Sequence, residues 1–153
     1  MNKISRKIVL FAVLILLCTV FIFSNSLKNS EMSHADSNVI VEIVEEIADT
    51  IHPDNTLNWN YIVRKSAHLF EFCVLGILVM LLAFQRNRGR GTAVVYALLY
   101  VVFIASTDEF IQRFTGRSSR LADVGIDVLG ALIGFGLIGT ARWVVKHRKS
   151  KKI

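Results

Sequence analysis

The sequence contains few charged residues, few cysteines and a single proline. Only 20% of its 153 residues are charged, below the quarter or so expected of a soluble domain. The two cysteines, Cys18 and Cys73, lie in apolar runs, so they are interpreted as small buried hydrophobic residues and not as a disulfide framework. Because 53% of the residues are hydrophobic, the composition excludes a disordered chain and argues against a soluble globular fold.

The apolar residues are gathered into long uncharged runs. Residues 8–27 and 91–107 are uncharged over 20 and 17 positions, enough for a helix to cross a hydrocarbon core of about 30 Å. Residues 72–85 and 128–141 are uncharged over 14 positions each and reach only about 21 Å as helices. Each of these two must therefore be extended from an end that carries ionisable side chains.

This pattern predicts an all-α integral membrane protein with four transmembrane helices that form two hairpins within one domain, residues 1–153. The expected spans are residues 8–27, 66–85, 91–108 and 122–141. A loop at 28–63 and a basic tail at 142–153 complete the chain. The first span could instead be a signal peptide, but its apolar core is long and residues 24–26 (Ser-Asn-Ser) are a poor cleavage site.

Basic residues predict the orientation of the spans. One side would hold twelve basic residues and no acid, in the N-terminus, the 86–90 turn and the tail. The other side would hold the remaining six basic residues and all twelve acids. The positive-inside rule then puts both termini on the cytoplasmic side of the membrane, which the family resemblance given below implies is a bacterial inner membrane. The net charge of +6 thus reports orientation, and no nucleic-acid partner is expected.

The external loop is expected to contain a helix of its own. Asp36 or Ser37 can cap a helix that begins near residue 38. In residues 39–51, isoleucine and valine form a stripe on one face and acidic residues lie on the other. Pro53 would end this helix. This amphipathic helix would lie over the outer ends of the bundle or on the membrane surface. Trp59 and Tyr61 fit an interfacial belt that leads into the second span.

Ionisable residues recur at the outer ends of the last three spans. Arg64, His68 and Glu71 follow the i, i+4, i+7 spacing of one helix face, and Asp123 and Asp127 are an i, i+4 pair. Groups at this depth should face one another inside the bundle, because each is costly against lipid. The candidate acid–base residues are His68, Glu71, Asp108, Glu109 and Asp123.

Arginine side chains beside these acids suit bidentate phosphate recognition. The candidate phosphate- or ligand-binding residues are Arg64, Lys65, Gln112, Arg113 and Arg117. Carboxylates with one imidazole also suit a divalent metal, with Asp108, Asp123 and Asp127 as candidate ligands, although the spacing selects no particular ion. The structural alternative is a set of ion pairs, Arg64 or Arg117 with Asp108, Glu109 or Asp123, that fixes helix register.

The last span also carries the small-xxx-small pattern Gly130-x-x-x-Gly134, which predicts close packing inside the bundle rather than a dimer face. No glycine-rich phosphate loop or serine nucleophile elbow is present in the sequence.

Several of these strings resemble the VanZ-like family. The first is Arg64-Lys65-x-x-His68-x-x-Glu71-Phe72, followed by Leu75-Gly76. The second combines Asp108-Glu109-Phe110-Ile111-Gln112 with Gly116-Arg117-Ser118, Asp123 and Gly130-Ala131-Leu132-Ile133-Gly134. Residues 23–26 resemble the serine-containing stretch of the family after its first span. Many members carry Asn where this chain carries Asp127, an acid that would need a partner or a proton.

The resemblance implies a bacterial membrane protein linked to resistance to teicoplanin, a glycopeptide antibiotic that acts on cell-wall precursors, without implying a reaction. Three hypotheses follow, and the oligomeric state stays open in all of them. The first is an enzyme that acts on a lipid-linked phosphate or other envelope precursor at the outer leaflet. The second is a non-catalytic protein that masks or reorganises surface targets, so that a lipid-anchored glycopeptide binds less well. The third is a structural or assembly subunit.

Overall fold

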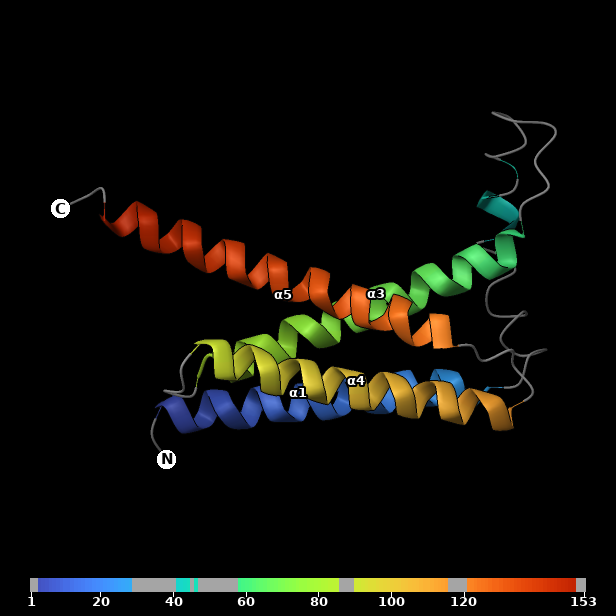
Figure 1. Cartoon of the computed structure of the whole chain (residues 1–153), viewed down its shortest axis with the longest axis horizontal. Helices are drawn as coiled ribbons and strands as arrows, with labels where there is room; N and C mark the ends of the chain where they lie inside the picture. The colour runs from blue at the N-terminus through green and yellow to red at the C-terminus, as the bar shows by residue number, and fades with distance from the viewer. Residues whose placement is uncertain are drawn as a thin grey trace.

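The computed structural model describes residues 3–28, 41–44, 46, 58–85, 90–115 and 121–150. Its helices are α1 (Lys3–Ser26), α3 (Trp59–Ala83), α4 (Arg90–Phe114) and α5 (Leu121–Ser150), and all four are long and apolar enough to cross a membrane. They run alternately up and down, so that both chain termini lie at the same end of the bundle (Figure 1). The described part of the chain contains no strand, and the predicted all-α membrane fold is confirmed.

The helices are longer than the expected membrane spans. α3 begins at Trp59, ahead of the span expected from residue 66, α4 continues past 108 to Phe114, and α5 continues into the expected tail as far as Ser150. The physical reason is that a charged side chain ends a hydrocarbon span without ending a helix. α3 starts where the Asn58 side chain accepts a hydrogen bond from the Tyr61 backbone N–H at 3.0 Å, as an N-cap does.

The external helix predicted at residues 39–51 lies largely outside the described residues. Residues 41–44 and 46 are helical, with Val41 buried and Glu42, Ile43 and Glu46 exposed.

α3 is the central helix, and it contacts α1, α4 and α5. Its most extensive contact is with α5, which belongs to the other hairpin of the expected arrangement. Glycines allow the two backbones to approach: a Cβ built on Gly130 would clash with the carbonyl oxygen of Leu69, and one on Gly134 would clash with that of Cys73. Gly76 of α3 meets the backbone of Ala131 in the same way. The small-xxx-small pattern therefore serves packing within the bundle, as predicted.

The apolar core lies on one face of each helix, and large apolar side chains cover the outside. On α3 the buried face runs from His68 through Phe72 and Leu75 to Val79. The opposite faces of all four helices expose large hydrophobic residues, such as Leu16, Phe70 and Phe103. An apolar outer surface, in addition to an apolar core, is what a bundle surrounded by lipid requires.

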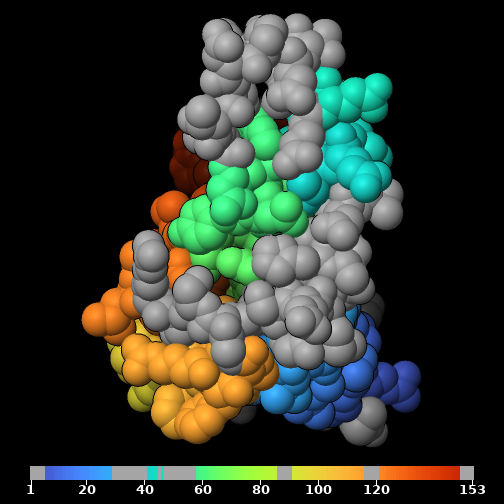
Figure 2. All heavy atoms as spheres, turned by 90° about the vertical axis from the view of Figure 1, so that its right-hand side faces the viewer, coloured from blue at the N-terminus to red at the C-terminus, as the bar shows by residue number. Residues whose placement is uncertain are grey.

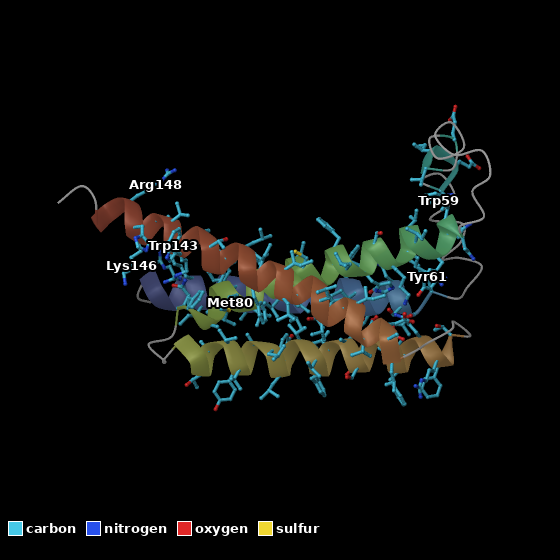
Figure 3. The ribbon with its side chains drawn as sticks, turned by 45° about the horizontal axis from the view of Figure 1, so that its top comes forward. Trp59, Tyr61, Met80, Trp143, Lys146 and Arg148 are labelled. Carbon is cyan, nitrogen blue, oxygen red and sulfur yellow. The ribbon has the colours of Figure 1, made fainter. Side chains whose placement is uncertain are left out.

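Aromatic residues mark both ends of the bundle. Trp59 and Tyr61 lie at one end, and Trp143 lies with Lys146 and Arg148 at the other (Figure 3). Trp and Tyr at the two ends of membrane helices form interfacial belts at the headgroup level. The hydrocarbon region therefore falls between these two levels.

Candidate functional site

Polar residues from all four helices meet at the end of the bundle opposite the termini. In the space-filling view of that end, the green N-terminal turns of α3 lie above the orange residues that end α4 and begin α5, with blue α1 beside them (Figure 2). We call this group of buried and half-buried residues the polar centre and define it by residues of α1, α3, α4 and α5 in turn: Asn25, Ser26; Lys65, His68, Glu71; Asp108, Glu109, Gln112; Asp123, Asp127.

His68 lies between two carboxyl groups. Its Nδ1 is 3.8 Å from Asp108 Oδ2 on α4 and 3.9 Å from Glu71 Oε2 on its own helix. His68 is 5% exposed and Asp108 is fully buried, so little water reaches the imidazole. An imidazole held beside carboxylates is the usual arrangement of a proton-transferring group.

Both carboxyl groups are held in turn by an amide from another residue. The Asn25 side chain donates to Glu71 Oε1 at 2.8 Å, across from α1 to α3. The Gln112 side chain donates to Asp108 Oδ2 at 2.7 Å and to Ser26 Oγ at 3.2 Å. Each amide hydrogen bond restrains one of the two carboxyl groups that lie near His68.

Lys65 is the cation of the polar centre. Its Nζ is 2.8 Å from Asp123 Oδ2 on α5 and 4.0 Å from Glu109 Oε1 on α4. The sequence suggested that Arg64 pairs with these acids, whereas in the structure its neighbour Lys65 makes the ion pairs with Asp123 and Glu109. Lys65 ties α3 to both α4 and α5 and offsets part of the charge of two buried acids.

Asp127 lies one turn deeper along α5 than Asp123. It is 2% exposed, and Asp108, Glu109, Lys65 and Asp123 are all near enough to interact with it electrostatically. Its Oδ2 has no hydrogen-bond partner among the described residues. The deepest acid of the polar centre thus lies near three other acids and one lysine.

The metal hypothesis gains no geometric support from the described residues. Within that part of the chain, no three His, Cys, Asp or Glu side chains are grouped as a metal site. Asp108 and Asp123, the first two candidate ligands, are instead directed to the His68 and Lys65 side chains.

The candidate phosphate-binding residues separate into two groups. Lys65 and Gln112 are engaged inside the polar centre. Arg64 is half-buried and Arg113 is exposed, so both lie at its rim, and Arg117 lies outside the described residues.

Asn25 and Ser26 were not among the sequence candidates. Ser26 is fully buried, and its backbone carbonyl also accepts from the Thr115 hydroxyl at 3.2 Å. The signal that could have identified them is a short polar stretch, residues 24–26, at the end of a long apolar run.

Comparison with family models identifies the family of this chain. The model of a family described as VanZ/LLP1 matches residues 9–142, which include the whole polar centre. No curated protein and no solved structure matches the chain.

Proposed function

Because the chain is a multi-pass membrane protein that belongs to the VanZ/LLP1 family, we propose that its polar centre binds a phosphate-bearing lipid-linked precursor of the cell envelope at the outer leaflet. His68 would transfer a proton to or from this ligand. The single observation that carries the proposal is the position of His68 between two carboxyl groups, each held by an amide. The bundle does not need these groups for stability, because well-packed apolar side chains in their place would stabilise it as well or better.

The composition of the polar centre favours a phosphate at its rim over one inside it. The centre holds five acids and one lysine, which disfavours an anion among them. Arg64 and Arg113 lie at the rim and offer guanidinium groups suited to phosphate. Arg64 is one helical turn from His68, so a ligand held by Arg64 presents its reacting bonds toward the imidazole.

Turnover in proteoliposomes tests this proposal. The protein is reconstituted with a polyprenyl diphosphate, and phosphate release and the extracted lipids are measured. Since positioned acid–base groups contribute about 100-fold or more, His68→Gln and Asp108→Asn should each lower the rate by at least that factor. Thr107→Ala is the matched control, because among the described residues this hydroxyl bonds to the Phe103 carbonyl of its own helix and not to the polar centre. Equal rates in all three variants would refute an acid–base role.

A second candidate is a structural role, favoured by the interhelical bonds of the polar centre. Asn25 joins α1 to α3, Gln112 joins α4 to α1, and Lys65 joins α3 to α5. If that is their whole purpose, the same substitutions change only protein abundance and thermal stability. Variants that fold normally but lose turnover would decide against it.

The link to teicoplanin is proposed as a consequence of chemistry or masking at the precursor. Expression of the wild-type protein in a susceptible bacterium should reduce both labelled teicoplanin at the cell surface and growth inhibition. A non-catalytic masking protein would keep this effect in His68→Gln, whereas an enzyme would lose it. If the protein changes neither growth inhibition by teicoplanin nor the amount of labelled teicoplanin at the cell surface, it has no role in teicoplanin resistance.

A further inference from the structure

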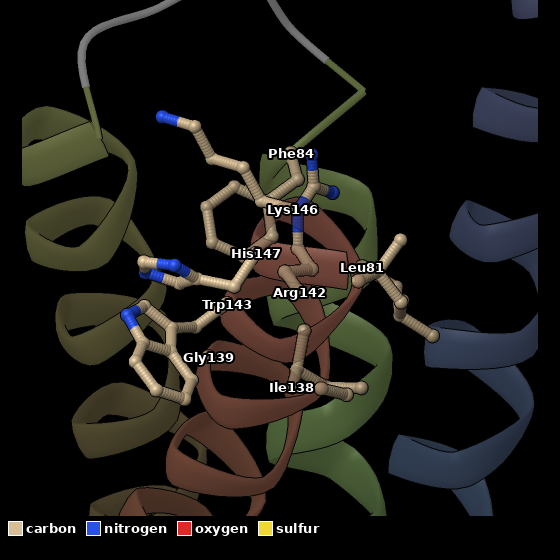
Figure 4. A pocket seen from close by; sticks show the side chains of 10 residues that line it. Leu81, Phe84, Ile138, Gly139, Arg142, Trp143, Lys146 and His147 are labelled. Atoms are coloured by element: carbon tan, nitrogen blue, oxygen red, sulfur yellow. The ribbon is translucent and has the colours of Figure 1, made fainter. Parts of the chain in front are cut away.

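The end of the bundle that carries the termini contains a groove remote from the polar centre. It has a volume of about 920 Å³ and lies between the last turns of α3 and the C-terminal extension of α5 (Figure 4). The extension diverges from the other helices, and its residues 141–148 are exposed (Figure 1). The groove therefore opens on the surroundings of the bundle.

The lining of the groove is apolar below and basic above. Leu81, Ile138 and Gly139 form its apolar part, while Arg142 and Lys146 stand over it (Figure 4). The lining residues, all of them in the described part of the chain, include no acid. Such a surface suits a molecule with an apolar body and an anionic head.

Aromatic contacts hold the basic rim in place. The Arg142 guanidinium lies 4.2 Å from the centroid of the Phe84 ring, within cation–π range. The rings of Trp143 and His147 lie 4.4 Å apart on the same side of α5. Arg142 is thus presented over the groove and does not extend freely from the helix.

The groove lies at the level where the hydrocarbon region ends. The uncharged run of α3 stops at residue 85 and that of α5 at residue 141, immediately before Arg142. Trp143 next to it belongs to the interfacial belt at this end. In a membrane, lipid fills a gap between helices at this depth, and basic pockets between helices select anionic headgroups.

We propose that this groove is a binding site for an anionic phospholipid. The headgroup phosphate would contact Arg142 and Lys146, and an acyl chain would follow Leu81 and Ile138. The site is separate from the polar centre, so it stands whether or not the precursor proposal holds.

Native mass spectrometry of the full chain released from mixed phosphatidylglycerol and phosphatidylcholine nanodiscs tests the site. The wild-type protein should retain phosphatidylglycerol in preference to phosphatidylcholine. At about 1 kcal/mol for each basic residue, Arg142→Gln or Lys146→Gln should weaken retention about fivefold and the double variant about 30-fold. Arg6→Gln with Lys7→Gln is the matched control, because these exposed basic residues lie at the same end on α1.

A second pair of variants fills the groove without altering charge. A Cβ at Gly139 meets no atom within 4 Å, so Gly139→Leu occupies open space in the groove and should lower retention. Gly136 is equally open but does not line the groove, so Gly136→Leu should retain the lipid. Equal loss in the Arg6 and Lys7 control, no headgroup preference, or full retention by Gly139→Leu would each overturn the proposal.

Discussion

Nδ1 of His68 lies 3.8 Å from Oδ2 of Asp108, and this pair joins the central helix α3 to α4 inside the polar centre. Both residues are buried, and each belongs to a helix that also exposes large apolar side chains. Gln112 donates a hydrogen bond to the same Asp108 oxygen, so this carboxyl group is restrained beside the imidazole.

The first prediction concerns these positioning amides. Asn25→Ala and Gln112→Ala remove the donors that hold Glu71 and Asp108, so turnover of a lipid-linked phosphate should fall about 10- to 100-fold. Substrate affinity should change little, because neither amide lies at the rim. Steady-state kinetics in proteoliposomes separate kcat from KM. A rise in KM alone would show that these amides bind substrate directly.

The second prediction concerns the Lys65–Asp123 pair. Lys65→Met leaves the Asp123 carboxylate buried without its nearest cation, which should cost about 3–5 kcal/mol of stability. Adding Asp123→Asn removes the uncompensated charge, so the double variant should be more stable than Lys65→Met alone. Thermal unfolding in detergent measures both, and additive losses would show that the two residues are not coupled.

The third prediction concerns the contact between α3 and α5. Gly130→Leu or Gly134→Leu would push α5 away from the α3 backbone, at a cost of about 1–3 kcal/mol or more. Gly136→Leu, on the same helix in open space, should unfold at nearly the wild-type temperature. Equal stability of all three variants would contradict the packing described above.

Asp127 supplies a fourth prediction. It is buried near three other acids, so an amide of the same shape should raise the unfolding temperature. The expected gain for Asp127→Asn is about 1–3 kcal/mol. The unfolding temperature of Asp127→Leu shows the effect of replacing the carboxyl group by an apolar side chain. A loss of stability in Asp127→Asn would mean that the carboxylate has a charged partner there.

The fifth prediction concerns orientation. In a variant with Cys18 and Cys73 replaced by alanine, Glu42→Cys should react with an impermeant maleimide on intact cells. Arg148→Cys should react only after the membrane is permeabilised, because the basic end is expected in the cytoplasm. The reverse pattern would invert the topology and place the polar centre at the inner leaflet.

The sequence was sufficient to predict the four helices, because uncharged runs of membrane length leave few alternatives. The close approach of α3 and α5 was likewise indicated by Gly130 and Gly134. Helix ends were less accurate, since α5 continues through Arg142 and Trp143 where no proline or glycine stops it.

The rotation of each helix about its axis limited the prediction of the site. The sequence put Arg64 on the face of His68, and α3 keeps this spacing, but it did not show that Lys65 reaches Asp123. α1 is apolar nearly all round, so no periodicity shows which face it buries. Only its packing against α3 and α4 reveals that Asn25 and Ser26 reach the polar centre.

The most direct test of the central claim is photocrosslinking with a lipid-linked phosphate that carries a photoreactive group beside its phosphate. We predict that crosslinks concentrate on peptides containing residues 64–71 and 108–113 and are removed by excess unlabelled lipid phosphate. Crosslinks spread along the lipid-facing surface, around Leu16 and Phe103, and insensitive to competitor would contradict a binding site at the polar centre.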